Sequence, residues 1–457
     1  MKKQRLLAVL LMTALCTPVV ISCGDDDTKP DGGNGGVPTN AVLTTTEQKE
    51  FLEDVGLELN GKFKAEDFRH YTDLANYIDE AYDDYEWDDV EDWARDIWET
   101  LRGKSVGTST EKEEESWGNT TYTYYYNYTD YKALLLASNF TGRWEARNGR
   151  WHHKDADDLS FVCKNQSGQE CTLRLTTSGK VTKVHLYDDE DWKDYDYTMY
   201  VTNEYIDRTE CTIGVPQHIT LTLTEGGATL CETKVDIDLS SVSNEEFDLS
   251  RSAFNASSSS TLSNGYVVKG ENLAYSSKSA TGSATLIKSG ETLVTATTFT
   301  DLSGIPRELL TNLYDMDDDD IDKLFDKSTG NVAFNLDVLG KVQLKGSIND
   351  VRQLVNDCEA ADDDYENESR FKQDVENINN RIKAHIYYNG GTKEQADFLF
   401  IPFEDRWDRY VEWYMEPGIK FPDGSSYTLE KFFNEDDFKD LIDAVERLGD
   451  DFERLGD

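Results

Sequence analysis

The chain has 457 residues and a formal net charge of −44, from 90 acidic and 46 basic side chains. So acidic a protein does not bind nucleic acid through phosphate contacts, and it does not lie on an anionic membrane surface. Hydrophobic residues still make up 38% of the chain. The sequence therefore predicts a folded body of two or three domains, or of one large composite domain.

Residues 1–22 are typical of an export signal. A positively charged start precedes the apolar run 6–15, which is too short for a transmembrane helix, and Val20-Ile21-Ser22-Cys23 closes the segment. A small residue directly before a cysteine resembles the lipobox of bacterial lipoproteins, whose cysteine is acylated and becomes the new N-terminus. The resemblance implies a lipoprotein signal peptide over 1–22 and lipidation of Cys23. A plain signal peptide and a retained signal anchor are the alternatives.

Residues 23–43 predict a flexible tether, because their Gly- and Asp-rich composition cannot bury apolar surface. Asp25, Asp26 and Asp27 follow the cysteine directly. This acidic triplet resembles the signal that sends lipoproteins of the Bacteroidota to the outer face of the outer membrane. The resemblance implies a lipid-anchored protein at the cell surface. Alternatively, the triplet only keeps the tether solvated.

The body predicts an α+β fold in three parts. Residues 44–105 carry helical periodicity and begin with the capping residues Thr44 to Glu47. Residues 115–304 alternate with a period of two, which predicts an antiparallel β meander, as a curved sheet or a sandwich. Within this part, segment 219–241 aligns without gaps with segment 282–304, and we interpret the two as a repeated β-hairpin.

Residues 305–457 predict a mixed helix and strand region. Strands are expected over 331–348, a long helix over 349–383 with a break near Asp362, and a hairpin around Asn389-Gly390-Gly391. The aromatic residues Trp407, Tyr410 and Tyr414 have the spacing of a helical stripe. The final residues are expected to fray.

The sequence predicts no catalytic, cofactor or metal site. Serine hydrolase, zinc protease and phosphate-binding motifs are missing, and His152-His153 is interpreted as a solvated pair in a polar loop. The run 315–320 resembles the start of an EF-hand loop, but Asp320 stands where the loop needs glycine, which favours an acidic helix over calcium binding. Five cysteines of the body are open to disulfide pairing or to burial as thiols: Cys163, Cys171, Cys211, Cys231 and Cys358.

Aromatic residues are the candidate ligand-binding groups. The chain holds 24 tyrosines and 9 tryptophans, and such rings offer a flat apolar face with a polar tip. The candidates for stacking on a ligand are Tyr124, Tyr126, Trp144, Trp151 and Trp413. Each of these also fits a core position of a strand or helix.

The expected function is non-catalytic binding of a glycan or protein ligand by a membrane-anchored lipoprotein. The signal segment, tether and aromatic-rich body together resemble cell-surface lipoproteins of the Bacteroidota. One alternative is a periplasm-facing carrier of lipid or another hydrophobic ligand on a concave sheet. A carboxylate-dependent hydrolase is another, for which 90 acidic residues single out no pair.

Overall fold

A computed structural model describes residues 41–242, 250–307, 329–363, 365–407 and 410–456. Strands make up 53% of it and helices 27%, so the protein is mostly β with helices added, as an α+β class requires. The described residues form two compact units: unit 1 holds those up to 74 and those from 250 onward, and unit 2 holds those from 75 to 242. The helical segment expected over 44–105 is thus shared between the units. The signal peptide, Cys23, Asp25 to Asp27 and the acidic run 315–320 lie outside the described residues.

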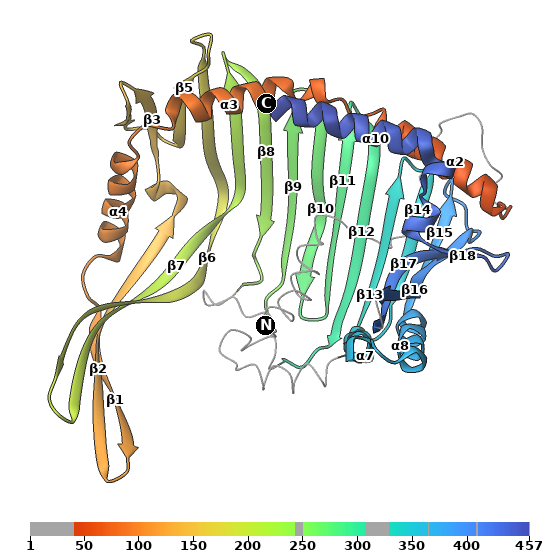
Figure 1. The fold of residues 1–457 in the computed structure, drawn as a ribbon. Helices are drawn as coiled ribbons and strands as arrows, with labels where there is room; N and C mark the ends of the chain where they lie inside the picture. Colours follow the sequence, from red (N-terminus) through yellow and green to blue (C-terminus); the bar gives the residue numbers. More distant parts are fainter. Residues whose placement is uncertain (1–40, 243–249, 308–328, 364, 408–409, 457) are drawn as a thin grey trace. The chain divides into compact units, whose positions relative to one another are not determined.

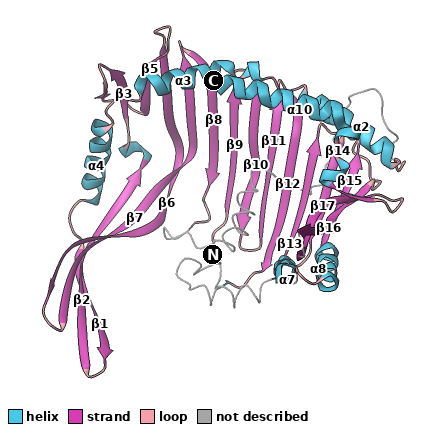
Figure 2. Ribbon diagram, viewed as in Figure 1, coloured by secondary structure: helices cyan, strands magenta, loops and turns pink. Residues whose placement is uncertain are grey.

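Unit 1 is built on a sheet in which each strand from β9 to β18 pairs antiparallel with the next strand along the chain. Figures 1 and 2 show these strands side by side. Their bounds are β9 Phe254–Leu262, β10 Tyr266–Ser276, β11 Ser279–Lys288, β12 Glu291–Gly304, β13 Thr329–Val338, β14 Val342–Ile348, β15 Ile382–Tyr388, β16 Ala396–Trp407, β17 Tyr410–Lys420 and β18 Ser426–Thr428.

Helix α2 (Thr45–Asn60) lies across the hairpin turns at one end of this sheet. It begins as predicted, with a capping box in which the Thr44 side chain accepts from the Glu47 N–H and the Glu47 side chain accepts from the Thr44 N–H. Glu58 pairs with Lys341 at the β13–β14 turn. Just beyond the helix, Lys62 pairs with Glu291 at the start of β12 at 2.7 Å. The helix therefore ties together hairpins that are far apart in sequence.

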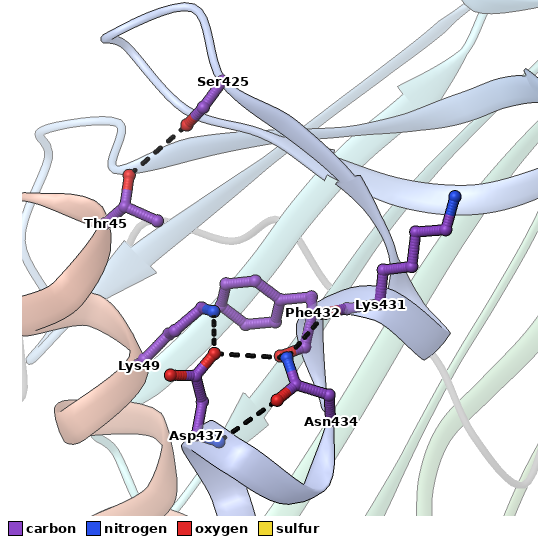
Figure 3. A network of polar contacts seen from close by, with 7 residues as sticks. All are labelled: Thr45, Lys49, Ser425, Lys431, Phe432, Asn434 and Asp437. Atoms are coloured by element: carbon purple, nitrogen blue, oxygen red, sulfur yellow. Dashed lines mark hydrogen bonds and ion pairs between the residues drawn. The ribbon is translucent and has the colours of Figure 1, made fainter.

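Helix α10 (Glu435–Gly456) lies beside α2 and runs in the same direction, because Lys49 pairs with Asp437 and, farther along, the Asn60 amide donates to the Ala444 carbonyl. Figure 3 shows the start of this contact. Asn434 caps the helix: its Oδ1 accepts from the Asp437 N–H, and its Nδ2 donates to the Asp437 carboxylate, each at 3.1 Å. The Lys49 ammonium, followed by the Asn434 amide, lowers the pKa of Asp437.

Two apolar clusters hold unit 1 together. The first joins α2 and α10 to β15 and β17 and includes Phe432 and Phe438, both fully buried. The second packs the helix pair α7 (Val351–Asp363) and α8 (Glu368–Arg381) against β16 and β17, with Ile378 at its centre. The two helices confirm the predicted break in the segment 349–383.

Unit 2 contains a mixed sheet. β2 pairs parallel with β7, and β3 pairs parallel with β5, whereas the other pairs of this unit are antiparallel. One antiparallel meander over 115–304 is therefore not confirmed. The bounds are α3 Arg69–Tyr82 (shared with unit 1), α4 Asp88–Arg102, β1 Gly107–Trp117, β2 Thr120–Leu136, β3 Gly142–Arg147, β4 Arg150–Lys154, β5 Leu159–Lys164, β6 Glu170–Tyr197, β7 Val201–Glu225 and β8 Ala228–Asp238.

The two segments of the predicted repeat form hairpins of the same local structure, β7–β8 and β11–β12. Each hairpin shifts register at the aligned position, between Leu223 and Thr224 in one and between Leu286 and Ile287 in the other. Asp238 accepts from the N–H of Ser240 at 2.9 Å, and the aligned Asp301 accepts from Ser303 at the same distance. The repeat is therefore structural as well as a sequence pattern.

Three expectations for local structure are wrong. The stripe Trp407, Tyr410 and Tyr414 lies on the paired strands β16 and β17, not on a helix. His152 and His153 belong to strand β4 rather than to a polar loop. The final residues continue helix α10 instead of fraying, because Phe452 packs on Phe68 with 5.6 Å between ring centroids.

Candidate functional site

Four strands of unit 2 form an arm, which we define as residues 107–130 and 190–208. The strand order is β1–β2–β7–β6, with β2 and β7 parallel and both outer pairs antiparallel. The shorter β5 and β8 pair with β6 and β7 only outside the arm. The arm is therefore a two-sided ribbon, and Figure 1 shows its strands running beyond the rest of the unit.

The register places a row of aromatic side chains on one side of the arm. Residues opposite each other in neighbouring strands share a face, and residues two apart along a strand do so too. Tyr124 is opposite Thr202, which is opposite Tyr197, and Tyr126 is likewise linked through Glu204 to Tyr195. We call this side the aromatic face; its rings are Tyr122, Tyr124, Tyr126, Tyr128, Trp192, Tyr195 and Tyr197.

The β6 half of the aromatic face is open to solvent. Trp192 is 56% exposed, Tyr195 65% and Tyr197 72%, values that a core strand does not show. The Tyr195 and Tyr197 rings stack with an interplanar angle of 18° and 6.1 Å between centroids. Trp192 meets Tyr126 edge-on at 6.3 Å. The face thus presents two pairs of contacting rings with exposed members, and exposed apolar patches are typical of binding sites.

Carboxylates border the aromatic face along β1. Glu111, Glu113 and Glu115 stand opposite Tyr126, Tyr124 and Tyr122. The Tyr126 hydroxyl donates to Glu113 at 3.1 Å. Burial, followed by this carboxylate, raises the pKa of Tyr126, so its hydroxyl stays protonated at neutral pH. The border supplies hydrogen-bond acceptors beside the rings.

An arginine closes the inner end of the aromatic face. The Arg208 guanidinium lies 4.5 Å from the centre of the Tyr128 ring and pairs with Asp130 at 2.9 Å. Tyr128 is only 8% exposed. The exposure of the rings therefore increases from the inner end of the row, at Tyr128, to the outer end, at Tyr197.

The opposite side of the arm carries hydrogen-bonded polar groups beside Tyr125 and Tyr205. Asn203 donates to Asp196 at 2.6 Å, and the hydroxyl of Tyr205 donates to the same carboxylate at 3.3 Å. Asn127 and Lys112 share this side. Tyr205 is itself 42% exposed, which provides an exposed aromatic residue on the opposite side of the arm.

The five aromatic residues singled out from the sequence separate into two groups. Tyr124 and Tyr126 lie on the aromatic face, partly exposed. The three tryptophans are buried: Trp144 and Trp151 are 2% and 6% exposed, and Trp413 is 7% exposed. Trp93 of α4 covers Trp144, with 5.5 Å between ring centroids, and Trp413 lies in the cluster under α7 and α8. These tryptophans hold the core rather than offering a surface.

Sequence reasoning missed Trp192, Tyr195 and Tyr197. They follow the acidic run 188–191, whose composition predicts a loop at a hairpin end, whereas the structure continues β6 through it to Tyr197. The available signal was the alternation of Tyr195 and Tyr197 around an aspartate, which has the period of a strand.

The five cysteines of the body are thiols. Cys163 and Cys171 face each other across β5 and β6. Burial, followed by the neighbouring Cys171, raises the pKa of Cys163 to about 11. Since the thiolate is the reactive form, Cys163 is not an activated nucleophile at neutral pH.

Comparisons of this chain with family models, curated proteins and solved structures give no match. Within the described residues, no helix has both the length and the apolar character needed to cross a membrane. The fold and the site therefore define the protein only as an α+β molecule with an exposed aromatic ribbon.

Proposed function

We propose that the protein is a lipid-anchored, non-catalytic binding protein of the cell surface whose aromatic face takes glycan ligands. The observation that carries the proposal is the exposed row Trp192, Tyr195 and Tyr197 beside Tyr124 and Tyr126. Soluble proteins rarely expose large apolar patches to water, and a large exposed patch marks an interaction site.

Sugar chemistry matches this surface. The apolar faces of sugar rings stack on tyrosine and tryptophan rings, and sugar hydroxyls donate to carboxylates such as Glu113. Successive tyrosines on one side of a strand are about 6.8 Å apart, so the row can follow an extended chain of sugar rings. The net charge of −44 adds a preference for neutral over anionic glycans.

The anchor belongs to the same proposal. Acylation of Cys23 by more than one chain holds a protein stably on its membrane, since each buried methylene contributes about 0.8 kcal/mol. Asp25 to Asp27 direct the protein outward, and the tether 23–43 holds the body away from the lipid.

Affinity electrophoresis tests the ligand class. The purified protein is run through native gels that each hold one soluble polysaccharide, chosen from neutral and anionic plant and host glycans. We expect retardation by at least one neutral polysaccharide and loss of retardation in Tyr195→Ala/Tyr197→Ala. Tyr205→Ala, on the polar side of the same arm, serves as the matched control and keeps the wild-type behaviour. Unretarded migration in every gel contradicts the glycan proposal.

Protease shaving of intact cells tests the location, with Cys23→Ala as the unanchored control. We expect clipping of the wild-type protein on whole cells. Protection until the outer membrane is opened contradicts surface display and directs the search to lipid that co-purifies with the protein.

A further inference from the structure

A cleft opens in unit 1 where strands β15 and β16 diverge. The two strands pair over 384–386 and 396–398 only, whereas β16 pairs with β17 along its described length. Helix α8 lines the resulting cleft, which has a volume of about 610 Å³. Asn379 of α8 spans the divergence: its amide donates to the Phe400 carbonyl and accepts from the Phe400 N–H, both at 2.7 Å. The backbone groups of Phe400 are thus satisfied.

Three groups that ligate metals converge where the paired part of β15 and β16 borders this cleft. His385 and Asp397 are cross-strand partners, with 2.8 Å between Nδ1 and Oδ1. Glu394, from the connection between the strands, completes the set, and one ligand atom from each residue lies within 4.8 Å of the other two. The Tyr387 hydroxyl donates to Glu394 at 3.4 Å, and the Tyr387 ring lies edge-on to His385.

We infer that His385, Glu394 and Asp397 form a binding site for a divalent transition-metal ion of the Zn²⁺ type. One imidazole nitrogen and two carboxylate oxygens are ligands that Zn²⁺ accepts, and three protein ligands leave a fourth position for water or a ligand. The ion takes the place of the hydrogen bond between His385 and Asp397. Tetrahedral ligands of Zn²⁺ lie roughly 3.4 Å apart, so the three ligand atoms, all within 4.8 Å of one another, need only small side-chain movements to hold the ion. His385 and Asp397 also line the cleft, so the fourth position is accessible from it.

Neighbouring lysines decide which ions bind. The row of cross-strand partners runs from Lys345 through His385 and Asp397 to Lys420. Their positive charges offset the two carboxylates, so a hard ion such as Ca²⁺ or Mg²⁺, which depends on carboxylate charge and number, gains little here. An ion that bonds strongly to imidazole still binds. The inference is independent of the proposed glycan binding, which concerns unit 2.

Titration calorimetry with ZnCl₂ and metal analysis after dialysis test the inference, on full-length protein without a histidine tag. We expect one Zn²⁺ per chain in the wild type above any weak background of the acidic surface. His385→Ala and Glu394→Gln should each weaken this uptake at least about tenfold. Glu394→Gln changes one exposed side chain, so it also covers a failure of the histidine variant to fold.

Glu376→Gln is the matched control, because Glu376 lines the same cleft outside the ligand set, and its uptake should equal that of the wild type. Removing the opposing charge in Lys420→Met should tighten Zn²⁺ binding. Equal Zn²⁺ uptake by wild type and His385→Ala overturns the inference, as does Ca²⁺ uptake at the same site with equal affinity.

Discussion

A single buried glutamine fixes the start of helix α2 to the sheet of unit 1. Gln48 is fully buried, its amide donates to the carbonyls of Leu43 and Gln395, and its Oε1 accepts from the Tyr388 hydroxyl at 2.8 Å. Burial raises the pKa of Tyr388, so this hydroxyl remains a donor at neutral pH. The position shows how a polar residue can belong to the core when each of its groups has a partner.

Tyr388→Phe should lower the free energy of unfolding by about 1–3 kcal/mol, because it leaves the Gln48 Oε1 buried without a donor. Denaturant unfolding of wild type and variant measures the loss. Tyr387→Phe, one residue away on the other side of β15, is the control and should change stability by less than about 0.5 kcal/mol. Equal effects of the two substitutions would show that Gln48 finds another donor.

Glu145 makes the stability of unit 2 depend on pH. Lys154, followed by Arg143, lowers the pKa of Glu145 to about 2, against about 4.3 in an unfolded chain. A lowered folded-state pKa gives a stabilisation that is fully present above the unfolded value and is lost as the pH falls towards the folded value. The Glu145 side chain is 21% exposed, so solvent screens part of the effect.

Glu145→Gln should therefore lower the free energy of unfolding by about 1–2 kcal/mol at pH 7. The difference from wild type should shrink below about pH 4.3 and vanish near pH 2. Denaturant titrations between pH 2 and 7 measure this difference in the free energy of unfolding. A difference that stays constant over this range would mean that the substitution acts through packing instead of charge.

The path of the long strand β6 depends on one glycine. Gly179 has φ +84° and lies where the β6–β7 register shifts between Ser178 and Val181. A Cβ atom there would lie 2.8 Å from both Gln217 Cβ and His218 Cδ2. The glycine thus permits a bulge that bends the strand on its way to the arm.

Gly179→Ala should destabilise unit 2 by about 2–4 kcal/mol, from the positive φ together with the clash. Gly118→Ala tests the effect of a positive φ without a clash, since Gly118 has φ +63° and no atom near its Cβ position. This substitution should lower the free energy of unfolding by about 1–2 kcal/mol. Thermal melts of both variants compare the two sites. Equal losses would mean that the bulge relaxes around the added methyl group.

The sequence predicts those helices and strands whose structure is determined by residues within the same segment. The capping box of α2, the two parts of the segment 349–383 and the repeated hairpin are of this kind. Strand β1 was not predicted, because its run of Glu and Lys has no apolar face and its strand structure depends on pairing with β2. The aromatic residues Tyr410 and Tyr414 of strand β17 have helical spacing with Trp407, but these residues form strands because β17 pairs with β16.

The candidate site shows the same division. Tyr124 and Tyr126 were predicted from their alternation along one strand, whereas Tyr195 and Tyr197 join them only through the parallel pairing of β2 with β7. The ligand set of His385, Glu394 and Asp397 has no recognisable motif either, because a hairpin register brings it together. A single sequence does not show which residues of distant strands pair with one another.

For the whole molecule, charge is the dominant constraint. With a net charge of −44, the folded chain is under self-repulsion, which salt screens over a Debye length of about 10 Å at 0.1 M. The midpoint of thermal unfolding should therefore rise when NaCl increases from low to physiological concentration. A midpoint that is unchanged or falls with NaCl would show that local ion pairs such as Lys62–Glu291 outweigh the net repulsion.

The aromatic face of the arm is the proposed ligand surface. The dissociation constant for the polysaccharide that retards the protein best, measured by titration calorimetry on three proteins, tests this assignment. Tyr195→Ala/Tyr197→Ala should raise the constant at least about tenfold through the loss of two stacking rings, while Tyr205→Ala should match the wild type. Equal affinities for all three proteins, or equal losses in both variants, would contradict the assignment of ligand binding to this face.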